Sequence, residues 1–155
     1  MKIVVASDHA GLDLKLEMIK VLEERKNSGE DIEINDIGTH DKNSTDYPMW
    51  GEKAAVEVAE GRADKGLIIC GTGMGISLAA NKVKGVRAAV CSDTYTAKMS
   101  REHNNCNMLA LGARTLGTGL ATDILNIWLD TPFEEGGRHQ RRVDMLVDIE
   151  NRRLK

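Results

Sequence analysis

A glycine-rich stretch that follows an apolar run has the residue types of a site for phosphate or for a developing oxyanion. Residues 67–69 predict a buried strand, and Cys70 stands where that strand ends. Glycines at positions 71, 73 and 75 let the backbone approach a ligand, so successive N–H groups can point inward at the start of the next helix. The same stretch also fits a tight strand-to-helix connection whose cysteine is a small core residue.

Other polar residues stand at positions where further predicted strands end. Asp8 and His9 come after the first apolar run, Asp93 after the fourth and Arg114 after the fifth. The carboxyl ends of parallel strands gather at one edge of a sheet, and ligands bind there. We therefore expect these side chains to lie near Cys70. Asp8 could equally act as a cap for the helix that follows it.

The elements that would position these residues alternate along the chain. Apolar and β-branched runs predict five strands, at residues 2–6, 32–37, 67–70, 86–91 and 108–111. Helical spacing predicts intervening helices at 12–22, 54–59, 77–82, 94–102 and 116–129, and a charged terminal helix at 138–153. Residues 38–48 are too polar and turn-rich for either element. The alternation predicts a single α/β domain, residues 1–155, with a parallel sheet and helices on both faces.

Composition limits the classes of function. The chain of 155 residues is 41% hydrophobic, enough for one sizeable core, and its net charge of -3 leaves no basic field to attract nucleic acid or an acidic membrane. No 18 apolar residues run together and no leader-like segment precedes the first strand, so we expect a cytoplasmic protein. Cys70, Cys91 and Cys106 have no metal-like spacing, and their odd number favours reduced thiols over disulfides.

Six segments carry a family resemblance that covers nearly the whole chain. In order they are residues 7–11, 46–48, 70–77 with 80–82, 101–105, 111–114 and 136–139. At these intervals they resemble the type B ribose-5-phosphate isomerases and the related galactose-6-phosphate isomerases. The resemblance implies a Rossmann-like three-layer fold with a five-stranded parallel sheet, and interconversion of an aldose phosphate with its ketose. It also implies no metal or cofactor, and a homodimer or dimer of dimers whose active sites are shared between subunits.

This chemistry moves one proton between C2 and C1 of the sugar through an enediolate, so it needs a base and donors for an oxyanion. Cys70 matches the family's proton-transfer cysteine, and the start of a helix would favour its thiolate. One branch of the family has a glutamate in this loop, but the matching position here is Ile76. The oxyanion donors would be a hydroxyl and three backbone N–H groups, those of Thr72, Gly71, Gly73 and Gly75.

Further matches concern the sugar itself. His103 matches the residue credited with ring opening, a proton shuttle suited to imidazole, and Asn104 stands beside it. The resemblance implies that Asp8 binds sugar hydroxyls and that His9 lies near the substrate. Tyr47 would line the pocket or would simply pack under its loop.

Basic residues near the end of the chain are the candidates for a phosphate anchor. Arg138 and Arg142 are four apart and share a helical face, where two guanidinium groups can grip a dianion, with help from His139. Arg114 is a third candidate and would come from the partner subunit, like the ring-opening histidine. The alternative is a solvated basic face, since the same helix carries three further arginines, Arg141, Arg152 and Arg153.

Three other functions compete with an isomerase. A nicotinamide-binding domain would use the glycines and Asp93, but its third glycine falls on Ile76 and no room remains for a substrate domain. A cysteine phosphatase needs an arginine at the far end of the loop, and the loop has none. A non-catalytic sugar-phosphate-binding module stays open. The sugar also stays open, since galactose 6-phosphate and allose 6-phosphate are alternatives to ribose 5-phosphate, and we expect the helix from about residue 138 to contribute to the dimer.

Overall fold

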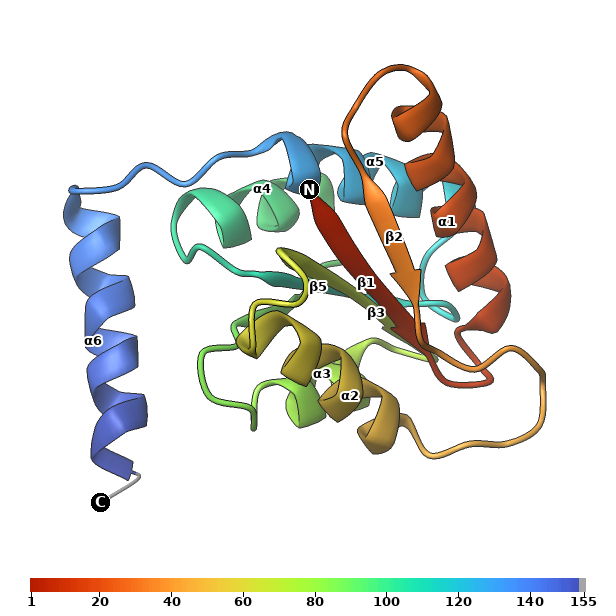
Figure 1. Cartoon of the computed structure of the whole chain (residues 1–155), viewed down its shortest axis with the longest axis horizontal. Coiled ribbons are helices and arrows are strands. Elements are labelled where there is room, and N and C mark those ends of the chain that lie inside the picture. The colour runs from red at the N-terminus through yellow and green to blue at the C-terminus, as the bar shows by residue number, and fades with distance from the viewer. Residues whose placement is uncertain (154–155) are drawn as a thin grey trace.

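A five-stranded sheet with all strands parallel forms the centre of the computed structural model, which describes residues 1–153 (Figure 1). Its strands are β1 (Lys2–Ser7), β2 (Glu33–Asp36), β3 (Lys65–Cys70), β4 (Ala88–Val90) and β5 (Met108–Gly112). Their order across the sheet is β2-β1-β3-β5-β4. This arrangement confirms the predicted fold class. The last two residues of the predicted domain, 154–155, lie outside the described part.

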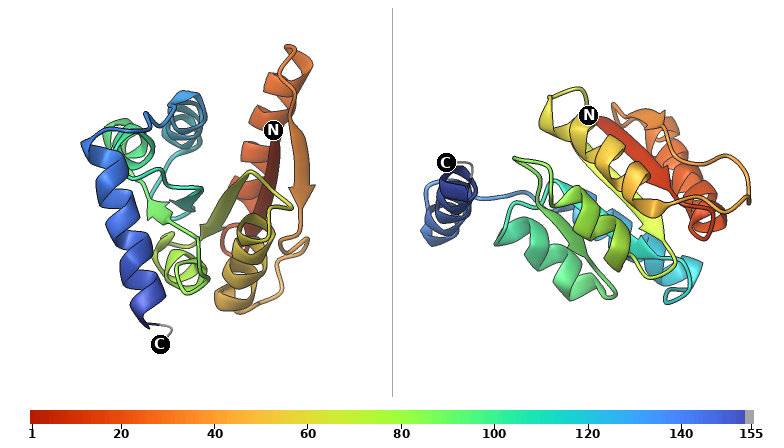
Figure 2. Two further views of the ribbon diagram at one scale, coloured as in Figure 1. Left: turned by 60° about the vertical axis from the view of Figure 1, so that its left-hand side comes forward. Right: turned by 90° about the horizontal axis from the view of Figure 1, so that it is seen from below.

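Helices cover both faces of the sheet (Figure 2). Helices α1 (Leu12–Asn27), α4 (Thr94–Glu102) and α5 (Thr118–Asp130) supply buried residues to the core on one face. Helices α2 (Tyr47–Ala59) and α3 (Met74–Ala80) do so on the other. Strand side chains alternate between the two cores: Ile3 and Val5 face the first, Val4 and Ala6 the second. Because both faces are covered, the strands read as continuous apolar runs.

Most element boundaries differ from the sequence-based expectation, and three of these differences have a clear structural context. Helix α2 begins at Tyr47, inside the predicted loop, because Pro48 fits the first turn of a helix, where its missing N–H costs nothing. Helix α3 begins at Met74, so Gly75 belongs to its first turn and not to the loop. Strand β4 has three residues instead of six, and it lies at the sheet edge with β5 as its one neighbour.

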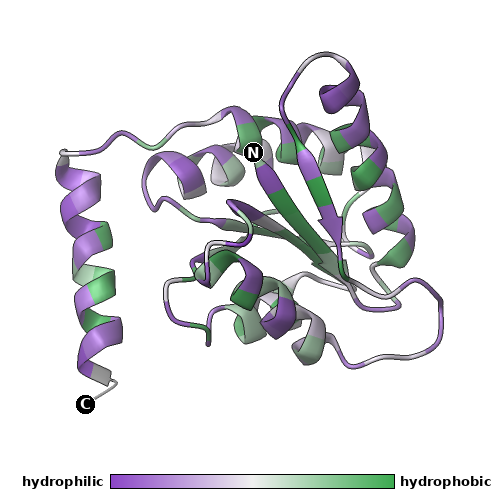
Figure 3. Ribbon diagram, in the orientation of Figure 1, coloured by the Kyte–Doolittle hydropathy of each residue, from purple (hydrophilic) through white to green (hydrophobic). Residues whose placement is uncertain are grey.

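The last helix, α6 (Arg138–Arg153), stands apart from the layers (Figure 1). Its contacts with the body include the stacking of the His139 ring on His103 and a hydrogen bond from the Gly85 N–H to Glu150 Oε1 at 2.9 Å, and its Val143 is buried. Apolar residues interrupt its polar surface (Figure 3), and four of them are exposed: Met145, Leu146, Val147 and Ile149. Within residues 1–153 no helix has both the length and the hydropathy to cross a membrane.

Candidate active site

Cys70 is the last residue of β3, the middle strand, and only 4% of its surface is exposed. Its Sγ accepts a hydrogen bond from the backbone N–H of Gly73 at 3.2 Å. Gly73 has φ +76°, and a Cβ there would lie 3.0 Å from the carbonyl carbon of Leu111, so the turn requires glycine. The glycine turn thus directs a backbone N–H at the Cys70 sulfur. Thr72 is exposed at the tip of the same turn.

Arg114 lies beside this loop in its own chain. Its backbone N–H donates to the carbonyl of Gly71 at 2.9 Å, and a Cβ on Gly71 would lie 3.4 Å from its Nη1. The register explains the contact, because Cys70 pairs with Gly112 and the segment after β5 must emerge next to the segment after β3. The structure therefore corrects the expectation that Arg114 arrives from a partner subunit.

The two aspartates that follow strands both accept backbone N–H groups near the start of a helix, but only Asp93 of the two is a helix cap. Asp8 is 6% exposed, and its Oδ1 accepts the Gly11 N–H at 3.0 Å, which fixes the turn into α1. Asp93 accepts the Thr96 N–H at 2.7 Å and caps α4. The hydrogen bonds from the Thr96 backbone and side chain hold the pKa of Asp93 below its usual value. Gly11 is the N-cap of α1 and no side chain caps that helix, so the capping role expected for Asp8 is not realised, while its role toward sugar hydroxyls stays a prediction.

His9 is held at the same edge by the loop between β2 and α2. The backbone N–H of Thr45 donates to His9 Nδ1 at 3.1 Å, so the neutral ring carries its proton on Nε2. The indole Nε1 of Trp50 in turn donates to Thr45 Oγ1 at 3.0 Å. This chain of two hydrogen bonds fixes which nitrogen of His9 can donate to a ligand.

The start of that loop is anchored by Lys15, a fully buried lysine in α1. Its Nζ donates to both carboxylate oxygens of Asp36, at 2.7 and 2.9 Å, and to the carbonyl of Thr39 at 2.8 Å. These three bonds use all three ammonium protons, which is the condition for burying the charge at acceptable cost. The loop that presents Thr45 is therefore tied down at both ends.

Tyr47 both packs and faces outward. A Cβ on Gly75 would lie 2.7 Å from its ring, so the ring rests directly on the first turn of α3. Yet 41% of the Tyr47 residue is exposed. Both roles predicted for Tyr47 are compatible with this placement, and Gly75 is required for the close approach of the ring.

A second group of predicted residues gathers where α4 ends. The rings of His103 and His139 stack with centroids 4.1 Å apart and planes 5° from parallel. Arg138 Nε lies 3.3 Å from His139 Nε2. Loss of hydration lowers the pKa of His139, and the nearby charges of His103, Arg138 and Arg142 lower it further, against an opposing effect of Glu102. The lowered pKa favours the neutral form of His139, and the arginines supply the positive charge of this group.

These two groups lie at opposite ends of the strands, the Cys70 group at the carboxyl ends and the His103 group at the amino ends. Helix α4 follows the carboxyl end of β4 and carries the chain back, so His103 and Asn104 precede the start of β5. The Gly66 N–H, near the start of β3, bonds the Asn107 carbonyl, whereas Cys70 ends that strand. The four residue steps from Gly66 to Cys70 span roughly 13 Å at about 3.3 Å per step. Cys70 and His103 of one chain therefore do not share a site.

We name the two groups by their central residues. The cysteine half-site comprises Asp8, His9, Tyr47, residues 70–75 and Arg114. The histidine half-site comprises His103, Asn104, Arg138, His139 and Arg142. Within residues 1–153, no three His, Cys, Asp or Glu side chains are arranged to hold a metal ion.

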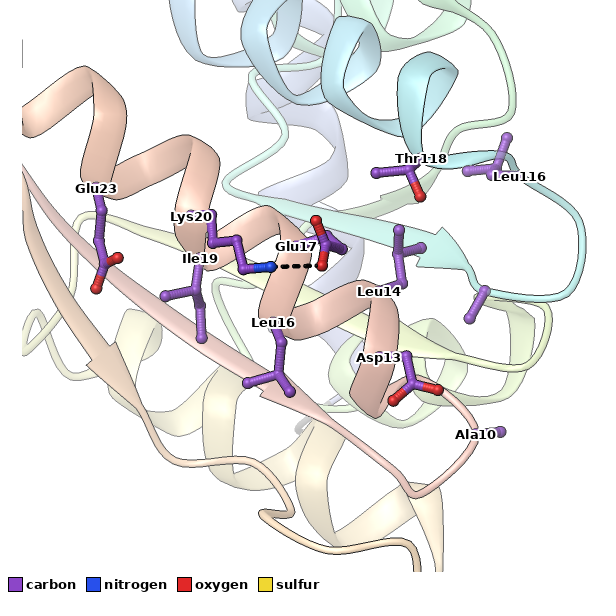
Figure 4. A pocket seen from close by; sticks show the side chains of 11 residues that line it. Ala10, Asp13, Leu14, Leu16, Glu17, Ile19, Lys20, Glu23, Leu116 and Thr118 are labelled. Carbon is purple, nitrogen blue, oxygen red and sulfur yellow. Dashed lines mark hydrogen bonds and ion pairs between the residues drawn. The ribbon is translucent and has the colours of Figure 1, made fainter.

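A hollow of about 670 Å³ lies elsewhere, between α1 and the start of α5 (Figure 4). Among its lining residues are Asp13, Leu16, Glu17, Leu116 and Thr118. The lining includes no member of either half-site and has more carboxylates than cations. Its charge is unsuited to an anionic ligand, so we do not assign it to the active site.

Comparison with known proteins decides the family. The sequence profile described as Ribose/Galactose Isomerase matches residues 3–146. The chain belongs to this isomerase family. It is 47% identical to ribose-5-phosphate isomerase B of Escherichia coli (strain K12) over 152 residues, which cover 98% of each protein.

Solved structures agree with this membership. Ribose-5-phosphate isomerase B of Clostridium thermocellum is 51% identical and superimposes with a TM-score of 0.92, over 98% of this chain and 99% of that one. The Mycoplasma genitalium enzyme, solved with bound ribulose-5-phosphate, is 38% identical with a TM-score of 0.87, over 97% and 96% of the two chains. Both structures span essentially the whole of this isomerase-family chain.

Sequence reasoning missed the residues that hold this family member's cysteine half-site in place. Lys15 could have been found, because it lies three residues after Leu12 and three before Met18, on the buried stripe of α1. Thr45 could not, because it acts through its backbone N–H, which every residue except proline possesses. Trp50 donates a hydrogen bond to Thr45, and nothing in the sequence around Trp50 indicates this role.

Replacement of Lys15 by Met should lower the free energy of unfolding by about 3 to 5 kcal/mol, because it leaves Asp36 and the Thr39 carbonyl without their buried partner. The matched control is Lys20→Met on the exposed side of the same helix, which should change stability by less than about 1 kcal/mol. Urea denaturation of both variants measures the difference. Equal stabilities would show that the Lys15 contacts are dispensable.

Proposed function

We propose that the protein interconverts ribose 5-phosphate and ribulose 5-phosphate, an aldose–ketose isomerisation. The observation that carries the proposal is the placement of Cys70 at the end of the central strand, with a donor N–H on its sulfur. Family membership supports the reaction class, and the relatives' names support the pentose phosphate. The family description includes galactose isomerases as well, so hexose 6-phosphates are the second candidate substrates.

In the proposed reaction Cys70, as thiolate, removes the proton from C2 of the open-chain aldose. The electrons of the C2–H bond form a C1–C2 double bond, and the carbonyl oxygen on C1 becomes an oxyanion. Thr72 and the N–H groups of the glycine turn stabilise that charge. The proton is returned to C1, O1 is protonated, and the proton on O2 leaves, so that the ketone forms at C2. No net proton is gained or lost.

His103 has a separate task in this proposal, the opening of the sugar ring. An imidazole can take the proton of the C1 hydroxyl and give one to the ring oxygen. Arg138 and Arg142, with His139 beside them, would hold the phosphate dianion at the other end of the sugar. These residues belong to the histidine half-site, so they must reach the substrate from another chain.

We therefore propose a homodimer, with a dimer of dimers as an extension, in which each active site combines one cysteine half-site with the histidine half-site of the partner. Four exposed apolar side chains of α6, those of Met145, Leu146, Val147 and Ile149, support an interface at this helix. Helix α6, from Arg138 onward, would then pack between subunits, and residues 1–155 would act as one catalytic domain.

A cytoplasmic location completes the proposal. The three cysteines are all free and buried in the described structure. Burial raises the pKa of the Cys106 thiol to about 11 and also raises that of Cys91, so both thiols stay protonated and inert. Free thiols are the normal state in a reducing compartment.

Turnover of ribose 5-phosphate, allose 6-phosphate and galactose 6-phosphate by the purified protein tests the function. We expect the highest kcat/KM for ribose 5-phosphate, measured by direct detection of the ketose. A preference for either hexose phosphate would replace the substrate but keep the reaction. Binding of all three without turnover would establish a non-catalytic sugar-phosphate-binding module instead.

Replacement of Cys70 by Ser should lower kcat by at least about 100-fold, because the hydroxyl keeps the shape but does not form the anion that acts as base at neutral pH. Incorporation of solvent deuterium into the sugar in heavy water measures the step directly, and binding of the sugar phosphate should persist. The control is Cys91→Ser, whose exchange should stay near that of the parent. Normal exchange by Cys70→Ser would assign the base to another residue.

Mixing subunits tests the composite site. His103→Ala and Cys70→Ala proteins should each be inactive, yet a mixed dimer contains one site with both groups intact. After unfolding and refolding together, activity should return to roughly a quarter of the parent value, since half of the dimers are mixed and each has one complete site. If mixed dimers form and stay inactive, the composite arrangement is wrong.

A further inference from the structure

The loop of residues 103–107, which joins α4 to β5, carries His103 and Asn104 and is held in an unusual conformation. Asn105 has φ +46°, and within residues 1–153 it is the one non-glycine residue with positive φ. Residues other than glycine seldom adopt this backbone geometry, although asparagine does so more often than most. The orientation of the two residues before it depends on whatever holds Asn105.

Arg87, at the start of β4, supplies that support. Its Nε donates to the carbonyls of Asn104 and Asn105, each at 3.1 Å, and its Nη2 donates to the Asn105 carbonyl at 2.9 Å. Its backbone is fixed as well, because its N–H donates to Asn107 Oδ1 at 2.8 Å and its carbonyl accepts from Met108. The planar guanidinium fork thus bridges two successive carbonyls from a rigid base.

Arg101 grips the same loop from within α4. Its Nη1 donates to Asn105 Oδ1 at 3.0 Å and to the Cys106 carbonyl at 2.6 Å. Arg101 is only 8% exposed and its guanidinium also lies 5.5 Å from the ring of Trp128, so it belongs to the core as much as to the loop. Arg87 is therefore the residue whose contacts with the loop can be removed with the least damage elsewhere.

The turn before Arg87 connects this loop to α6. The Gly85 N–H donates to Glu150, and the Gly85 carbonyl accepts from Asn107 Nδ2 at 2.9 Å. A hollow of about 330 Å³ beside it is bordered by Arg87, Asn104 and Glu150, among others. The short segment 85–87 thus bonds both parts of the histidine half-site, the 103–107 loop and helix α6.

We propose that Arg87 is a positioning residue of the isomerase: it fixes the 103–107 loop so that His103 and Asn104 are presented in the geometry that the partner's cysteine half-site requires. The proposal rests on the function proposed above and deepens it. Arg87 does not touch the substrate in this account. It acts through the backbone of Asn104 and Asn105.

Three variants test the proposal by kinetics. Arg87→Met removes the hydrogen-bond donors and keeps the length of the side chain. Arg87→Lys restores a single charged donor group but not the planar guanidinium. The control is Arg62→Met, at a distant arginine that pairs with Glu57. We expect kcat to fall roughly 10- to 100-fold in Arg87→Met, since small misplacement of reacting groups has effects of that order. Arg87→Lys should be intermediate, and Arg62→Met unchanged. Inhibition by inorganic phosphate should stay within about threefold of the parent in all three, because the arginines of α6 remain.

Subunit mixing then distinguishes a local from a general defect. Arg87→Met mixed with Cys70→Ala should regain activity, because one site combines an intact cysteine half-site with an intact histidine half-site. Arg87→Met mixed with His103→Ala should not, because both variants damage the same half-site. Equal recovery in both mixtures, or recovery in neither while Cys70→Ala and His103→Ala complement each other, would overturn the proposal.

Hydrogen exchange provides a readout that does not depend on the proposed function. The Asn105 and Cys106 amides bond the carbonyls of Arg101 and Ser100, so they should be protected in the parent protein. In Arg87→Met their exchange should be roughly tenfold faster while amides of α1 and α5 keep their rates. Unchanged exchange in the loop, or faster exchange throughout the chain, would refute the positioning role even if the protein has no isomerase activity.

Discussion

All five strands of the sheet run in the same direction, and this constraint decides which residues of a chain can meet. Every segment after a strand emerges at one edge, and every segment before a strand lies at the other. Cys70 and Arg114 follow strands, so they share the first edge. His103 and Asn104 precede β5, so they lie at the second. In a chain of this topology the two groups cannot be brought together by moving a loop, because the sheet itself stands between them.

Both half-sites are oriented largely through main-chain groups. At one edge a backbone N–H of the loop after β2 chooses the tautomer of His9. At the other edge the carbonyls of Asn104 and Asn105 are held by Arg87. Such contacts fix the loops against rigid elements, which is how irregular segments reach the precision that proton transfer requires. The buried ion pair of Lys15 with Asp36 contributes indirectly, because it anchors the start of the loop whose Thr45 N–H bonds His9.

Much of this could be predicted from the sequence. Continuous apolar runs alternate along the chain with segments of helical spacing. This pattern was enough to predict the parallel sheet, because strands covered on both faces contain few polar residues. The place of Cys70 followed from the end of its run, and the gathering of His103, Arg138, His139 and Arg142 agreed with the family motifs.

What could not be predicted depends on side-chain packing and on backbone donors. The predicted strand order placed Arg114 near Cys70, as the pairing of Cys70 with Gly112 confirms, whereas the family resemblance assigned Arg114 to a partner and was wrong on this point. The start of α2 at Tyr47 was missed because a polar run before a proline resembles a loop until the tyrosine is seen to pack on Gly75. The hydrogen bond from Thr45 to His9 is donated by a backbone N–H, which every residue except proline has, so the residue type does not predict it.

The light attachment of α6 to its own chain bears on how the protein is made. During synthesis the segments of the sheet leave the ribosome in order, and the last strand, β5, is available before α6 begins at Arg138. The body of the subunit can bury both of its cores without that helix, since the core residues of the sheet all precede it. Folding of the sheet is thereby separated in time from the docking of α6. A nascent subunit would carry a finished glycine turn around Cys70 before Arg138 and Arg142 have been added to the chain.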